Sequence, residues 1–132
     1  MTLVDSNVLI DIWSQDADWF DWSSQRYSEC MLAGEVGINV VIYAEIGLGF
    51  GSESELDQAV SAAGLKRLEL PFAAAFGAGR AYREYRRSGG LRTSALPDFF
   101  IGAHAQVAGL TLLTRDPSGY RSYFPDIALI CP

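Results

Sequence analysis

Four acidic residues spread along the chain could together bind a divalent metal ion. Asp5 and Asp116 each follow a short, largely apolar segment that predicts a strand. Glu45 lies in a largely apolar segment, and Asp98 follows Pro97. Carboxylates that lie close together repel one another, so such a cluster is stable only with raised pKa values or a bound cation. Oxygen ligands without His or Cys suit Mg²⁺ or Mn²⁺, which could activate water for attack on a phosphodiester.

Each of these carboxylates also has an ordinary structural explanation. Asp98 suits the first turn of a helix, where the helix dipole favours an acid. Asp116 is followed by Pro-Ser-Gly and suits a turn. Asp5 and Glu45 are harder to explain in this way, because both lie among apolar residues and a buried acid needs a partner. Spacing alone therefore predicts an acidic metal site and goes no further.

The segments around the four acids predict strands that alternate with helices. We expect short strands at 3–4, 34–38, 65–70, 110–114 and 127–130, and helices at 8–31, 40–48, 52–64, 71–87 and 96–107, with a loop at 91–95 and a turn at 116–119. No period repeats, so the predicted fold is α/β, with a mostly parallel central sheet flanked by helices. In such a sheet the carboxyl ends of the strands meet at one edge, where ligands bind. The length of 132 residues suits one domain, covering 1–132.

The first predicted helix, 8–31, is rich in aromatic residues and could be broken near Ser14. As one helix it would turn a single stripe toward the core, made of Trp13, Phe20, Tyr27 and Met31. Trp22 would then face solvent and, with Trp19 beside the stripe, is a candidate contact for a protein partner. The alternative is a break at Ser14 or Ser23 that turns Trp22 inward.

The charge distribution is uneven. A formal net charge of −6 argues against a general nucleic-acid coat, which would be basic. Half of the basic residues nevertheless fall within thirteen positions: Arg80, Arg83, Arg86, Arg87 and Arg92. Arg80, Arg83 and Arg87 would form one stripe on the helix 71–87, either as a track for RNA phosphates or as a solvated helix face.

The two cysteines predict free thiols. Cys30 and Cys131 lie far apart and have no metal-ligand spacing, which indicates a reduced, cytoplasmic setting. No apolar run approaches the length of a membrane span, and no basic start of a signal peptide is present. We therefore expect no membrane partner.

Two residues on the helix 96–107 are interpreted as structural. His104, the single histidine, lies six positions after Asp98 and so faces away from it on a helix. Gly102 lies one turn after Asp98 on the same side, where it could admit a substrate or a neighbouring helix, and we favour helix packing.

Four segments in order along the chain resemble the successive motifs of PIN domains. They are Val-Asp-Ser-Asn-Val-Leu-Ile-Asp at 4–11, Asn-Val-Val-Ile-Tyr-Ala-Glu at 39–45, Leu-Pro-Asp-Phe-Phe-Ile-Gly-Ala-His-Ala at 96–105 and Leu-Leu-Thr-Arg-Asp at 112–116. They resemble most closely the VapC toxins of bacterial type II toxin–antitoxin systems. Ser6 stands where many of those toxins have Thr, and the region from Gly47 to Leu70 matches only in general character.

This resemblance implies a PIN fold and an endoribonuclease that depends on Mg²⁺ or Mn²⁺ and is inhibited by a VapB-like antitoxin. It implies an RNA substrate and either a homodimer or a toxin–antitoxin hetero-oligomer. It also suggests polar support from Asn7 and Thr114. The metal-site role would fall on all four acids: Asp5, Glu45, Asp98 and Asp116.

Two other functions compete with the nuclease. A haloacid-type phosphatase also has an aspartate at a strand end, but it needs a second aspartate two residues later, where this chain has Asn7. A catalytically silent PIN-like protein-binding or RNA-binding module is the more serious alternative. Such a module would be expected to lack one of the four acids, and this chain has them all.

Overall fold

Five parallel strands form one sheet through the middle of the structure, a computed structural model that describes residues 1–91 and 95–132. The strands are β1 (Thr2–Val4), β2 (Val36–Ile38), β3 (Lys66–Arg67), β4 (Thr111–Leu113) and β5 (Leu129–Ile130). Their order is β3-β2-β1-β4-β5, and Thr2 in the central strand pairs with Val36 on one side and Thr111 on the other. This confirms the predicted α/β fold class, with Asp5 at the carboxyl end of the central strand.

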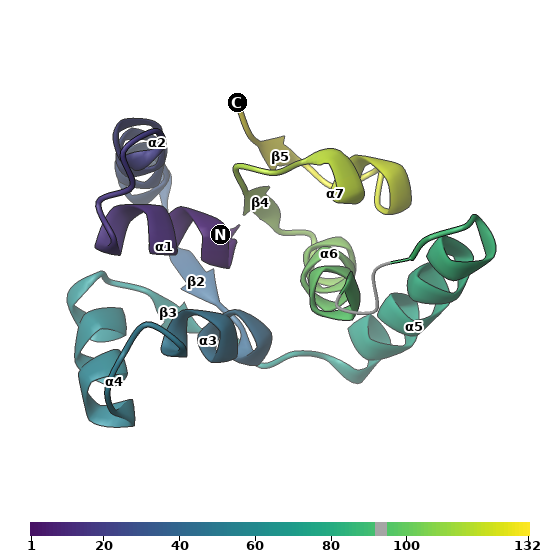
Figure 1. Ribbon diagram of the computed structural model, residues 1–132, viewed down its shortest axis with the longest axis horizontal. Coiled ribbons are helices and arrows are strands. Elements are labelled where there is room, and N and C mark those ends of the chain that lie inside the picture. The colour runs from purple at the N-terminus through teal and green to yellow at the C-terminus, as the bar shows by residue number, and fades with distance from the viewer. Residues whose placement is uncertain (92–94) are drawn as a thin grey trace.

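Helices flank the sheet in two groups (Figure 1). The helices are α1 (Ser6–Trp13), α2 (Phe20–Ala33), α3 (Val40–Gly47), α4 (Glu53–Ala62), α5 (Phe72–Arg87), α6 (Leu96–Ala108) and α7 (Ser118–Tyr123). In the view of Figure 1, α1 to α4 lie on the left, and α5 lies alongside α6 on the right. None of the helices in the described residues has the length and apolar character that crossing a membrane requires.

The central strands are largely apolar because helices cover both of their faces; in β1 and β4 only the first residue, a threonine, is polar. Leu3 and Val4 of β1 and Leu112 and Leu113 of β4 are fully buried. Local signals fix the helix starts. The Asn39 side chain accepts a hydrogen bond from the Ile42 main-chain nitrogen at 3.0 Å and so caps α3.

The aromatic segment is broken, as one of the sequence alternatives proposed. Helix α1 ends at Trp13, and α2 begins only at Phe20. In between, Gln15 has a positive φ of 52°, and the Asp16 carboxylate accepts hydrogen bonds from the main-chain nitrogens of Asp18 and Trp19, both at 2.9 Å. This local turn gives α2 a direction of its own.

The break overturns two expectations that assumed a continuous helix. The prediction of a single core stripe that includes Met31 is wrong, because the Met31 side chain is 44% exposed. The expectation that Trp22 faces solvent is also wrong. Trp22 is half-buried, packs against the core and contacts the edge of Trp19, with ring centroids 5.9 Å apart.

The other difference lies near the C-terminus, where the turn predicted at 116–119 continues into α7. Burial of Tyr120 and Phe124 holds this short helix against the core. Its packing accounts for Gly102, because a Cβ atom there would lie 2.4 Å from the Phe124 ring, so helix packing is confirmed. Most of the loop predicted at 91–95, including Arg92, lies outside the described residues.

Candidate active site

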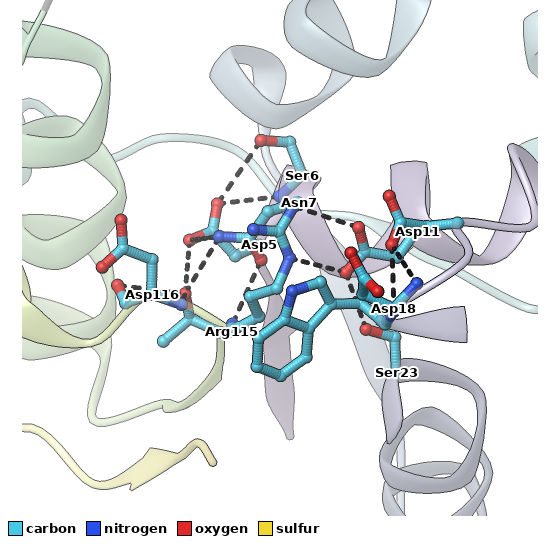
Figure 2. Close-up of polar contacts among 11 residues, drawn as sticks. Asp5, Ser6, Asn7, Asp11, Asp18, Ser23, Arg115 and Asp116 are labelled. Atoms are coloured by element: carbon cyan, nitrogen blue, oxygen red, sulfur yellow. Dashed lines mark hydrogen bonds and ion pairs between the residues drawn. The ribbon is translucent and has the colours of Figure 1, made fainter. Parts of the chain in front are cut away.

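Asp5 is the centre of a hydrogen-bond network that joins segments far apart in the sequence (Figure 2). It is 3% exposed, and its Oδ1 accepts a hydrogen bond from the Ser6 main-chain nitrogen at 2.8 Å. Its Oδ2 accepts hydrogen bonds from Thr114 Oγ1 at 2.8 Å, Tyr120 OH at 2.9 Å and Asn7 Nδ2 at 3.4 Å. Burial raises the pKa of the Asp5 carboxyl, although the hydrogen bonds from Thr114 and Tyr120 favour its ionised form.

Glu45, on α3, is the second acid of this network. The Ser6 hydroxyl donates to Glu45 Oε1 at 3.0 Å and lies 3.4 Å from Asp5 Oδ1, so one serine spans both carboxylates. Burial raises the pKa of Glu45, and the negative charges of Asp5 and Asp98 raise it further. Two acids from other segments of the chain, Asp5 and Asp98, therefore act electrostatically on Glu45.

Asp98 and Asp116 line a neighbouring cavity of about 210 Å³ together with Tyr120. Asp98 lies in the first turn of α6, and both acids are exposed. Asp116 follows β4, and its main-chain nitrogen donates to Thr114 Oγ1 at 3.1 Å. Thr114 thus contacts the segment of Asp116 as well as Asp5.

The donor set fits a hard divalent cation. Within residues 1–91 and 95–132, no three His, Cys, Asp or Glu side chains already group closely enough to enclose a metal ion. Mg²⁺, however, keeps several waters and needs only one or two protein carboxylates directly. Asp5 and Glu45, which share the Ser6 hydroxyl, supply two carboxylates and so meet that requirement. The neighbouring negative charges that help to raise the pKa of Glu45 would favour a positive charge there.

Comparison with known families identifies the family of this chain. The PIN domain family matches residues 2–124. The chain belongs to the PIN domain family. PIN domains are generally nucleases, and they generally use divalent metal ions.

Several solved structures share the PIN fold of this chain. The VapBC2 complex of Rickettsia felis with promoter DNA gives a TM-score of 0.71 at 15% identity, over 99% of this chain and 98% of that one. VapBC-1 of nontypeable Haemophilus influenzae gives a TM-score of 0.73 at 14% identity, over 98% of this chain and 96% of that one. A toxin–antitoxin complex of Klebsiella pneumoniae gives a TM-score of 0.66 at 22% identity, over 97% of this chain and 96% of that one. No curated protein matches the sequence.

The PIN fold brings the predicted supporting residues to Asp5 and adds one that the sequence did not reveal. Asn7 and Thr114 both contact Asp5 as expected, and their part in the chemistry stays a prediction. Tyr120 was missed because the segment around it predicted only a turn. Burial, together with the charges of Asp5 and Asp98, raises its pKa well above the ordinary value, so its hydroxyl remains a hydrogen-bond donor.

The remaining candidates lie outside this network. His104 is buried, and its Nδ1 lies 3.0 Å from Asn39 Nδ2, as expected of a structural histidine. Burial lowers its pKa, which favours the neutral ring. Arg80, Arg83 and Arg87 are exposed on α5. Their contact with RNA stays a prediction.

The raised pKa of Glu45 predicts a dependence of stability on pH. A carboxyl whose pKa is higher in the folded protein than in the unfolded chain contributes stability at low pH, and this contribution is lost as pH rises through the folded value. In EDTA at pH 7, Glu45→Gln should therefore raise the melting temperature, and the gain should shrink as pH falls toward about 4. Thermal denaturation across this range is the measurement, with Asp126→Asn as a control on the surface. A gain independent of pH would contradict the assignment.

Proposed function

We propose that this PIN domain is the toxin of a VapBC-type toxin–antitoxin module, an endoribonuclease that depends on Mg²⁺ or Mn²⁺. The observation that carries this proposal is the placement of Asp5 and Glu45 at the carboxyl edge of the sheet, where one Ser6 hydroxyl contacts both carboxylates and the charge of Asp98 helps to raise the pKa of Glu45. Membership of a family of nucleases supports it, as does the shared fold with VapBC complexes. RNA as the substrate follows from the resemblance of the four motifs to VapC toxins.

The ion would be held by the four acids, Asp5, Glu45, Asp98 and Asp116. When bound, a divalent ion activates water and offsets the charge that develops on the phosphate. The protein orients the ligands in advance. Thr114 and Tyr120 hold one oxygen of Asp5 and the Ser6 amide holds the other, so the carboxylate has little freedom to rotate. Asp98 and Asp116 are exposed and leave the site open to a polymer.

Loss of one acid should abolish cleavage without unfolding the protein. Asp98→Asn changes an exposed side chain in the first turn of α6, so the fold should persist while RNA cleavage in Mn²⁺ falls by at least about 100-fold. Asp126→Asn is the matched surface control. Undiminished cleavage by Asp98→Asn, or cleavage by the unchanged protein in EDTA, would contradict the proposal. RNA binding without any cleavage by the unchanged protein would favour the silent binding module.

We place the RNA backbone along α5. This helix packs on α6, which carries Asp98, and its Tyr85 lines the cavity that contains Asp98. The Arg80 guanidinium lies 5.5 Å from the ring centre of Phe76, which is 70% exposed. Exposed aromatic rings beside arginines suit single-stranded RNA, because rings stack on bases and guanidinium groups contact phosphates.

The salt dependence of binding tests this path. Each phosphate contact on a single strand contributes a slope of about −0.7 to the log–log plot of affinity against salt. Arg83→Ala should therefore make the slope shallower by roughly 0.7, whereas Arg26→Ala on α2 should leave it unchanged. Fluorescence anisotropy with a short RNA is the measurement. Equal slopes for the unchanged protein and the two variants would contradict the RNA path and favour the alternative, a solvated helix face.

A groove on this chain suits the docking of an antitoxin better than the surface around Trp19 and Trp22 does. A cavity of about 610 Å³ is lined mostly by apolar residues, and Glu45 is also part of its lining. Its lining includes Leu48, which is 90% exposed, and Trp13, whose ring contacts the edge of Phe50 with centroids 5.4 Å apart. An amphipathic helix could lay its apolar face in such a groove and bring a basic side chain to Glu45.

Leu48→Asp should weaken the complex with the proposed VapB-like antitoxin. Because Leu48 is so exposed, the charge should not disturb the fold, and we expect a loss of about 2 kcal/mol in binding free energy by calorimetry. Leu32→Asp, on α2 and 89% exposed, is the matched control outside the groove. An equal effect of both substitutions, or of neither, would contradict the groove as the docking site.

A further inference from the structure

An ion pair between a buried carboxylate and a partly exposed guanidinium lies one step outside the acidic site. Asp11, on α1, is 1% exposed, and its carboxylate binds the Arg115 guanidinium through two hydrogen bonds, Nε to Oδ2 at 2.8 Å and Nη2 to Oδ1 at 3.0 Å. Ser23, on α2, donates a third hydrogen bond to Oδ2 at 2.9 Å. The Arg115 guanidinium also lies over the Trp19 ring, 5.6 Å from its centre.

This pair is built into the segment that carries two residues of the site. Arg115 is the residue between Thr114, which donates to Asp5, and Asp116, which lines the cavity with Asp98. Figure 2 shows Asp116 on one side of Asp5 and the Arg115–Asp11 pair on the other.

Helix α1 holds this segment at two points. Asn7 and Asp11 are four residues apart on α1 and so lie on the same side of the helix. The Asn7 Oδ1 accepts a hydrogen bond from the Arg115 main-chain nitrogen at 3.2 Å, while Asp11 holds the side chain of the same arginine. Since Asp5 caps the start of α1, the helix that orients Asp5 also fixes the exit of β4.

We propose that the Asp11–Arg115 ion pair is a positioning device that holds Thr114 and Asp116 in register with Asp5. Such a pair contributes little net stability, since the cost of removing the Asp11 charge, and part of the Arg115 charge, from water offsets their attraction. The best-attested use of ion pairs of this kind is to fix a register. The two-pronged contact of a guanidinium with a carboxylate is also directional, so it fixes the angle of the segment as well as its distance. This inference rests on the proposed metal-dependent function.

The test replaces both charges at once. In Asp11→Asn/Arg115→Gln the buried aspartate is replaced by a side chain of the same shape and the partly exposed arginine by a shorter neutral one. No buried charge is left unpaired and the net charge is unchanged, so the protein should fold. We expect its affinity for Mn²⁺, measured by calorimetry, to fall by about 10–100-fold, as for other residues that orient metal ligands. The unchanged net charge means that such a loss cannot come from long-range electrostatics.

Ser23→Ala is the matched control, because it removes a hydrogen bond to the same carboxylate without touching the β4 exit. Amide hydrogen exchange adds a readout that needs no metal. In the double variant, amide exchange at Arg115 and Asp116 should be faster by at least about tenfold, while Leu112 and Leu113 in β4 keep their protection. Ser23→Ala should leave the exchange rates of all four amides unchanged.

Unchanged exchange at Arg115 and Asp116 in the folded double variant would overturn the positioning role. So would Mn²⁺ affinity equal to that of the unchanged protein. If the unchanged protein fails to bind Mn²⁺, the proposed function is wrong, and the exchange measurement alone then decides whether the pair positions the segment.

Discussion

The burial of one carboxylate is the constraint on which the site depends. Asp5 ends the central strand of the sheet, where parallel neighbours and covering helices exclude water. An ionised group there would be very costly without partners, so the fold supplies donors from α1, the exit of β4 and α7. These donors come from both ends of the chain, and the requirement to satisfy Asp5 therefore also ties the ends of the chain together.

The same burial gives the site its chemistry. Hydrogen bonds hold Asp5 in place but do not cancel its charge, and Glu45 experiences that charge together with the charge of Asp98. A divalent cation would relieve this repulsion, which is the physical basis of the proposed metal binding. Around this acidic centre the protein places features of different character, an arginine-bearing helix on the side of Asp98 and an apolar groove at Glu45. This arrangement suits a nuclease that must meet both a polyanion and a protein inhibitor.

Local rules predicted much of the fold and the acids of the site. The helices predicted at 40–48 and 96–107 correspond to α3 and α6 within one residue at each end, and the apolar runs predicted as strands around Leu3 and Leu112 are buried in the sheet. An acid between apolar residues was also a sound reason to single out Asp5 and Glu45. The same reasoning could have found Asp11, which lies between Ile10 and Ile12.

What the sequence could not provide was the choice of partner. Tyr120 and Asp5 are 115 residues apart, and Arg115 and Asp11 are 104 apart, so only the packed fold brings these pairs together. The prediction that Trp22 is exposed was wrong for a related reason. Its direction depends on a short turn at Asp16, and a prediction based on helix periodicity assumes that no such turn intervenes.

The most direct test of this account is the anomalous scattering of manganese in crystals of the protein grown with MnCl₂. The account predicts a peak at the carboxyl edge of β1, in contact with the Asp5 carboxylate and reached by Glu45 or Asp98. It also predicts that the peak is lost in Asp5→Asn crystals grown in the same way. Ordered manganese elsewhere on the protein, with none beside Asp5, would contradict the central claim that these carboxylates form a divalent-cation site.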